Sequence, residues 1–264
     1  MLMRRFGEVT SMAMCALAIV SCAHARRQDV AANPASRHTA RVKGSTDAAN
    51  GFWEYLPLGY GGRTRSPLLV FWHGIGENGT GTAEDLAKVP LFGPPHLINN
   101  GTWQAASPLV VLSPQHGPRG CPSADEIHDF IAFAITHYKV DTSRVYLSGL
   151  SCGALGSASY LAKYGGKQVV ASVLIAGNAT AIWNATQCAL LRDVALWAFH
   201  GDADPVVSIN GDNTMMPRFV ACPTPRRDAR YTVYPGVDHD SWSRTYDGSA
   251  GHDVYAWMLG ISRP

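Results

Sequence analysis

Charge is scarce in this sequence, and neither sign is in excess. Of its 264 residues, 16% are Asp, Glu, Lys or Arg, and 22 basic residues nearly balance 20 acidic ones, for a formal net charge of +2. This balance gives no basis for binding nucleic acid or an acidic polymer, so we expect neither as a partner. After residue 22, no apolar stretch is long enough to form a transmembrane helix. Internal repeats are also lacking, and the length predicts one compact domain with a tail.

The first 22 residues, in contrast, have the pattern of an export signal. Arg4 and Arg5 precede an apolar run from Met12 to Val20, which is too short to span a bilayer but has the length of a signal-peptide core. The run leads into Ile19-Val20-Ser21-Cys22, which resembles the bacterial lipoprotein cleavage box. That resemblance implies a lipidated Cys22 and attachment to the cell envelope. An ordinary signal peptide, cut a few residues later, would instead give a secreted protein.

Residues 23–50 are rich in Ala, Arg, Ser, Thr and Asn and hold almost no large apolar side chains. A segment of this composition cannot bury enough surface to offset the entropy that it loses on ordering. We therefore predict a flexible tether over residues 23–50 and one folded catalytic domain over residues 51–264. Contact with a membrane is expected only through an N-terminal lipid anchor.

The expected mature chain holds four cysteines, at positions 121, 152, 188 and 222. In an exported protein, four cysteines are compatible with two disulfides, and the sequence allows three pairings. We favour Cys188–Cys222, because both residues lie in segments beside the same predicted strand. Cys121 and Cys152 would then form the second pair, and free buried thiols are the alternative.

Within residues 51–264, apolar strand-like runs alternate with helix-like segments. Leu68-Leu69-Val70-Phe71-Trp72 is a continuous apolar run, as expected for a strand buried on both faces. In residues 124–138, apolar side chains recur with helical spacing behind Ser123, which is suited to cap a helix. The predicted strands cover 52–58 at an edge, 68–72, 109–112, 144–147, 169–175, 194–199 and 230–234, and the predicted helices cover 124–138, 154–164, 215–222 and 252–259. This alternation predicts an α/β fold with a mainly parallel sheet and helices on both faces.

The segment Gly149-Leu150-Ser151-Cys152-Gly153 is the strongest candidate for chemistry. It follows a predicted strand and opens a predicted helix, the setting in which a tight turn exposes a nucleophilic serine. Glycines two residues before and after the serine leave room for that turn. The pattern predicts Ser151 as the nucleophile of a serine hydrolase.

A nucleophilic serine needs a base, and the pKa of histidine lies near working pH. His239 is our candidate because it follows the last predicted strand directly. His252 is the second candidate. His73 and His200 are interpreted as structural residues that form hydrogen bonds within their own loops.

The base in turn needs an acid that holds its tautomer and stabilises its charged form. Asp204 is preferred to Asp202 from its position in the loop after the strand that ends at Phe199. Asp238 and Asp240 flank His239 and are interpreted as turn residues. The chain order of serine, aspartate and histidine is that of α/β-hydrolases.

Small residues fill the loop His73-Gly74-Ile75-Gly76-Glu77-Asn78-Gly79, which follows another predicted strand. They would let backbone N–H groups approach the carbonyl oxygen of a substrate. We expect the N–H groups of Ile75 and Cys152 to form the oxyanion hole, in which each donor stabilises the transition state by about 2.7–4 kcal/mol.

Several segments together resemble one family, the secreted esterases related to polyhydroxybutyrate depolymerases, feruloyl esterases and the so-called predicted peptidases. They are residues 71–79, Ser113-Pro114-Gln115, residues 140–151 and residues 237–242. The resemblance covers residues 52–260 and implies the α/β-hydrolase fold, with Ser151, Asp204 and His239 as the catalytic triad. Cys152 and Ala154 stand where the family usually has Met and Gly.

The connection between the strands ending near Ile175 and starting near Val194 is short, so we expect no large cap domain. An open site on an exported protein suits bulky or polymer-attached esters. Asn178, Trp183 and Trp242 are candidate pocket residues, although the tryptophans could equally pack the domain. We expect a monomer that uses no cofactor and binds no metal.

The leading hypothesis is a carboxylic ester hydrolase that forms an acyl-enzyme. A serine peptidase with the same triad is the first alternative, although neither a charged pocket nor an extra domain for gripping a peptide is apparent. A non-catalytic surface lipoprotein on a hydrolase scaffold is the second.

Overall fold

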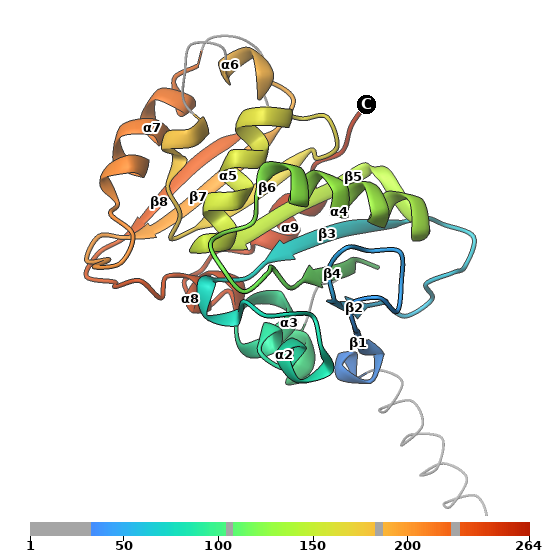
Figure 1. Ribbon diagram of the computed structural model, residues 1–264. Helices are drawn as coiled ribbons and strands as arrows, with labels where there is room; N and C mark the ends of the chain where they lie inside the picture. The colour runs from blue at the N-terminus through green and yellow to red at the C-terminus, as the bar shows by residue number, and fades with distance from the viewer. Residues whose placement is uncertain (1–32, 104–107, 183–186, 223–227) are drawn as a thin grey trace, which may run out of the picture.

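An eight-stranded sheet runs through the middle of the protein, with helices on both faces (Figure 1). The computed structural model describes residues 33–103, 108–182, 187–222 and 228–264. The strands follow the order β1-β2-β4-β3-β5-β6-β7-β8 across the sheet. Their bounds are β1 (His38–Arg41), β2 (Phe52–Tyr55), β3 (Ser66–Trp72), β4 (Val110–Pro114), β5 (Val140–Leu150), β6 (Ala171–Ile175), β7 (Ala195–Gly201) and β8 (Ala229–Tyr234).

From β4 to β8 all neighbouring strands are parallel, whereas β1 pairs with β2, and β2 with β4, in antiparallel fashion. Parallel neighbours require crossover connections, and these place helices on the faces of the sheet. The predicted α/β fold with a mainly parallel sheet is therefore confirmed.

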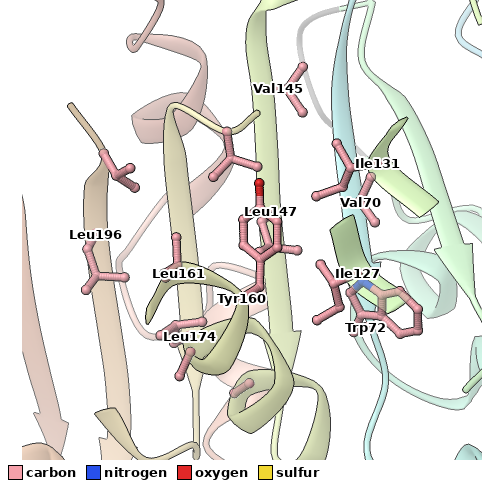
Figure 2. Close-up of a cluster of buried hydrophobic side chains, with 14 of the residues drawn as sticks. Val70, Trp72, Ile127, Ile131, Val145, Leu147, Tyr160, Leu161, Leu174 and Leu196 are labelled. Atoms are coloured by element: carbon pink, nitrogen blue, oxygen red, sulfur yellow. The ribbon is translucent and has the colours of Figure 1, made fainter. Parts of the chain in front are cut away.

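The two faces of β3 belong to different hydrophobic cores because successive side chains of a strand point to opposite sides. Leu68, Val70 and Trp72 lie in one core, which packs beneath α4 (Ala124–His137) and α5 (Cys152–Tyr164) (Figure 2). Leu69 and Phe71 lie in the other core, with side chains from α3 (Gly93–Asn99), α8 (Trp242–Tyr246) and α9 (Val254–Leu259). All seven residues of β3 are buried, as its continuous apolar run predicts.

The remaining elements are short, apart from α7. They are the helices α2 (Ala83–Leu86), α6 (Gln187–Leu190) and α7 (Asn210–Val220), and the 3₁₀ helices η1 (Pro34–Arg37), η2 (Ile75–Glu77), η3 (Val89–Leu91) and η4 (Ala179–Ile182). Ser123 caps α4 as predicted, since its hydroxyl accepts a hydrogen bond from the Glu126 amide at 3.1 Å. Within the described ranges, each helix is too short or too polar to cross a bilayer.

The predicted tether over residues 23–50 extends too far. Residues 34–37 form η1, and β1 pairs with β2 through four residues in register. The Arg37 side chain also donates hydrogen bonds to the Leu56 carbonyl, at 3.1 Å, and to the Tyr55 hydroxyl, at 3.2 Å. Backbone pairing and this arginine hold a segment that has few apolar side chains of its own. Consequently β2 is not the edge strand that was predicted, because β1 covers it.

Candidate active site

The turn between β5 and α5 is a strand-to-helix elbow with Ser151 at its tip. Ser151 has φ 48° and ψ −117°, a conformation that is rare for a residue with a side chain and typical of functional sites. Its amide donates to the Ile175 carbonyl at 2.9 Å. A Cβ at Gly153 would lie 2.1 Å from the Trp72 carbonyl oxygen, and one at Gly149 would lie 2.5 Å from the Gly153 backbone. The two glycines are therefore required for the elbow to form.

His239 lies on the loop after β8 and reaches the tip of this elbow. Its Nε2 is 3.0 Å from Ser151 Oγ, and its Nδ1 is 2.7 Å from Asp204 Oδ2. The ring of Trp242 packs edge-on against the imidazole, with 5.0 Å between ring centroids. Because Nδ1 faces a carboxylate, it carries the proton, and Nε2 is left to accept a proton from the serine hydroxyl.

Asp204 lies on the loop after β7, and its side chain is completely buried. Oδ1 accepts hydrogen bonds from the amides of Val206, at 2.8 Å, and Val207, at 3.0 Å. Burial alone would raise the pKa of Asp204, but hydrogen bonds from His239 and from these two amides outweigh it and hold the pKa below its usual value. The side chain is thus held as a carboxylate in one orientation.

The structure thus brings together Ser151, His239 and Asp204 in one hydrogen-bonded chain. Asp202 instead accepts a hydrogen bond from the Gly236 amide at 2.6 Å. Asp240 binds the amide and hydroxyl of Ser243 at the start of α8. The His252 ring packs edge-on against Trp197 on the second hydrophobic core, with centroids 5.3 Å apart.

A cavity of about 200 Å³ opens beside Ser151 and His239. It is lined by Gly74, Ile75, Gly76, Glu77, Phe92, Leu150, Ser151, His239 and Trp242. A larger cavity of about 660 Å³ lies by Leu97, Tyr246 and Tyr255, and Ser151 is not among the described residues that line it. We take the smaller cavity as the candidate substrate site because it contains the serine and the histidine.

The three candidate pocket residues have different outcomes. Trp242 lines the cavity beside Ser151. For Asn178 the structure shows other contacts: its Oδ1 accepts a hydrogen bond from the Thr180 amide at 2.8 Å, and it packs so tightly on Gly211 that a Cβ there would lie 2.2 Å from Oδ1. Asn178 therefore braces η4 against α7 and is not among the described residues lining the cavity. Trp183 lies outside the described residues, as does Cys22.

The two expected oxyanion donors are the first residues of two helices, and Ile75 also lines the cavity. Ile75 is the first residue of η2, behind an extended Gly74 with φ −78° and ψ 176°. Cys152 is the first residue of α5. Amides in the first turn of a helix have no carbonyl partner within that helix, so both positions can offer an N–H group to a ligand.

The loop after β3 is braced from behind by His73 and Gln115. His73 Nδ1 is 2.6 Å from the Gly74 carbonyl, and Nε2 accepts the His116 amide at 3.0 Å. The side-chain Nε2 of Gln115 donates to the carbonyls of Glu77, at 2.9 Å, and Asp85, at 2.8 Å. Burial lowers the pKa of His73 to about 4, so the ring is neutral at pH 7. His73 is therefore structural, as predicted, whereas the bracing by Gln115 was not anticipated.

Both disulfides that the favoured pairing implies are formed, Cys121–Cys152 and Cys188–Cys222. The first ties the residue directly after Ser151 to the segment before α4. The second joins α6 to the residue that follows the C-cap of α7. Within the described residues, no group of three or more His, Cys, Asp or Glu side chains is arranged to hold a metal ion.

The sequence matches no family model and no curated protein. Solved structures do resemble the fold. A thermostable esterase superposes with a TM-score of 0.67 at 22% identity, over 86% of this chain and 64% of the esterase. The feruloyl esterase module from Clostridium thermocellum gives 0.55 at 17% identity, over 85% of this chain and 86% of the module. The acetyl xylan esterase from Aspergillus awamori gives 0.56 at 14%, over 83% and 99%.

These likenesses show that the chain has the α/β-hydrolase fold. The chain spans just under two thirds of the thermostable esterase, and a putative dipeptidyl aminopeptidase IV from Bacteroides ovatus is matched over only 35% of its length. At identities of 22% or less, the shared fold does not fix a reaction. The reaction depends on the side chains of the site itself.

Proposed function

We propose that this protein is an exported serine hydrolase that cleaves carboxylic esters with Ser151, His239 and Asp204 as its catalytic triad. The observation that carries the proposal is the chain of hydrogen bonds at 3.0 Å and 2.7 Å that links the three side chains beside an open cavity. A binding protein has no need of this arrangement, whereas acyl transfer requires it.

In the proposed reaction, His239 Nε2 takes the proton of Ser151 as Oγ attacks the ester carbonyl. The amides of Ile75 and Cys152 stabilise the negative charge on the carbonyl oxygen. The tetrahedral intermediate collapses, and the alcohol leaves with the proton from His239. Water then attacks the acyl-enzyme by the same path, releasing the acid and restoring the serine.

Ser151→Ala tests the proposal directly. With p-nitrophenyl acetate or butyrate, the wild-type protein should release a burst of nitrophenol, and Ser151→Ala should reduce kcat by at least about 10⁴-fold. Ser159→Ala is the matched control, because Ser159 lies on the same helix with its hydroxyl bonded to the Leu155 carbonyl. An unchanged turnover in Ser151→Ala would overturn the assignment.

Substrate profiling separates the competing functions. The cavity beside Ser151 is open and partly apolar, which supports bulky or polymer-attached esters among acetyl, butyryl, feruloyl and polyester substrates. Cleavage of peptides but not of esters would establish the serine peptidase instead. Failure of Ser151 to react with a fluorophosphonate probe would favour a non-catalytic surface protein.

Export is supported by the two disulfides, since such bonds form and persist mainly in oxidising compartments. We propose that residues 1–22 direct this export and that Cys22 is lipidated. Mass spectrometry of the mature N-terminus after expression in a bacterium tests both points. A lipid mass that disappears in Cys22→Ala supports the anchor, whereas an unlipidated N-terminus cut a few residues later identifies a secreted form.

A further inference from the structure

His200, near the end of β7, contacts the same carboxylate oxygen of Asp204, Oδ2, as His239 does. Its ring is completely buried. Nε2 is 3.2 Å from Asp204 Oδ2 and 3.0 Å from the Val207 carbonyl, and Nδ1 is 2.7 Å from Asp212 Oδ2. The hydrogen-bonded chain that starts at Ser151 therefore continues through Asp204 and ends at Asp212, whose side chain is only 4% exposed.

The partners of His200 define its protonation state. Nε2 faces a carbonyl and a carboxylate, both acceptors, so this nitrogen carries a proton. Asp212 accepts the Ala179 amide on its other oxygen at 2.6 Å, and it lies in the first turn of α7, where a negative charge is stabilised. Asp212 therefore presents Oδ2 as an acceptor to His200 Nδ1, which donates a second proton to the hydrogen-bonded chain.

Burial alone would lower the pKa of His200, but the hydrogen bond and charge of Asp212 outweigh it and raise the pKa. The groups that face this pair come from each neighbouring element. The loop after β7 contributes Asp204 and the Val207 carbonyl, and η4 contributes the Ala179 amide, whereas His239 on the loop after β8 contacts Asp204. On β8, burial raises the pKa of the Tyr231 hydroxyl, and the negative charge of Asp212 adds to the rise.

We infer that His200 and Asp212 form a second histidine–aspartate pair, which positions Asp204 and sets the proton affinity of His239. This inference rests on the proposed function. Four donors surround the Asp204 carboxylate, and His200 is the one that also brings a positive charge from outside the triad. Since His200 stands between Asp204 and Asp212, its charge acts on Asp204 from a shorter distance than that of Asp212. The net field of the pair at His239 is positive and favours the neutral, proton-accepting imidazole.

Asp212→Asn tests the sign of this field. The carboxamide introduced at this position can still accept the Ala179 amide and donate to His200 Nδ1, but His200 becomes neutral and both charges are lost. The acid limb of kcat/KM for p-nitrophenyl acetate should move to higher pH by about 0.5–1 unit. Loss of one negative charge without a linked histidine would move the limb to lower pH. Asp202→Asn, an exposed change in the same loop as Asp204, provides that comparison.

An unshifted acid limb, or one shifted to lower pH, would overturn the inference, because a merely structural Asp212 would reduce stability and leave the profile in place. A second measurement depends neither on the folding of Asp212→Asn nor on ester hydrolysis. In Ser151→Ala, a pH titration of the imidazole ¹⁵N shifts should show that His200 keeps a proton on both nitrogens to higher pH than a histidine of an unfolded chain. A His200 that loses its second proton at lower pH than such a histidine would overturn the inference. If His200 keeps the proton but the wild-type protein does not hydrolyse esters, only the proposed function is refuted.

Discussion

The two walls of the candidate site use polar groups in opposite ways. On the wall formed by the loops after β7 and β8, the buried charges of Asp204, His200 and Asp212 are all hydrogen-bonded. On the wall formed by the loop after β3 and the start of α5, Ile75 and Cys152 are the first residues of η2 and α5, so their amides have no carbonyl partner within those helices. The polar groups of the first wall are saturated with hydrogen bonds, whereas the second wall keeps N–H groups that their own helices do not use.

The difference follows from what each wall has to do in the proposed reaction. A base must be held in one tautomer and one orientation before substrate arrives, so its partners are satisfied within the protein. An oxyanion hole must instead keep donors free for a charge that appears only during the reaction. Substitutions in the two walls should therefore have different effects on activity and stability.

The largest effect is expected on the saturated wall. Asp204→Asn should reduce kcat by about 10⁴-fold, since the amide cannot stabilise the charged, correctly oriented form of His239. The hydrolysis rate of p-nitrophenyl acetate measures this change. Asp202→Asn, which alters a carboxylate bonded to the Gly236 amide, is the control. A loss below tenfold in Asp204→Asn would mean that another residue supports the base.

On the other wall, Ile75→Pro removes one N–H group with little change of backbone. Proline is favoured at the first position of a helix, and the extended conformation of Gly74 suits a residue before proline. We expect kcat to fall about 10²–10³-fold with stability retained. Ile75→Ala keeps the N–H group and should stay close to wild type. Equal activity of the two variants would exclude Ile75 as an oxyanion donor.

The two disulfides offer a matched pair for separating stability from activity. They span 31 and 34 residues, so removal of either should lower the free energy of unfolding by a similar amount, about 2–4 kcal/mol. Only replacement of Cys121 and Cys152 by alanine should also lower kcat, because Cys152 adjoins Ser151. Urea unfolding and ester hydrolysis measure the two effects. Equal loss of kcat in the Cys188 and Cys222 double variant would contradict this division.

The smallest effect concerns the pH dependence of stability. Burial lowers the pKa of His73 to about 4, from about 6.5 in an unfolded chain, so the unfolded state binds the proton more readily. The contribution to stability is present above pH 6.5 and is lost as the pH falls towards 4, by up to about 3 kcal/mol. His38, whose pKa is also lowered to about 4 by burial, adds to the trend. Urea midpoints at pH 7 and 4.5 should show a smaller difference in His73→Gln, and an equal difference would contradict the account.

Much of the parallel sheet could be predicted from the sequence because its strands are apolar on both faces. The runs around Val70 and Val173 have no other stable place than the middle of a layered fold. The elbow was also predictable, because any such turn brings backbone atoms so close together that only glycine fits at the two positions flanking Ser151. The strands and the elbow depend mainly on residues that are close in sequence, so a short sequence pattern is enough to predict them.

The rest depends on partners that the sequence does not place together. The residues of β1 lack an apolar pattern, and they form a strand because β2 offers free backbone groups. Asp212 looks like an ordinary acid at the start of a helix until β7 brings His200 to it. Asn178 follows a strand end, as pocket residues often do, but Gly211 lets α7 pack directly against it. In each case a tertiary contact decides the role.

The order of the elements along the chain has a consequence for biosynthesis. A ribosome releases the elbow before it releases His239, which follows Ser151 by 88 residues. The strands β3, β4 and β5 can pair before β7 and β8 are synthesised. The nascent protein then has Ser151 at the tip of the elbow but no histidine to accept its proton. The proposed ester hydrolysis would begin only when the last strand joins the sheet. A chain interrupted before residue 239 would therefore be inert, however well its first half folds.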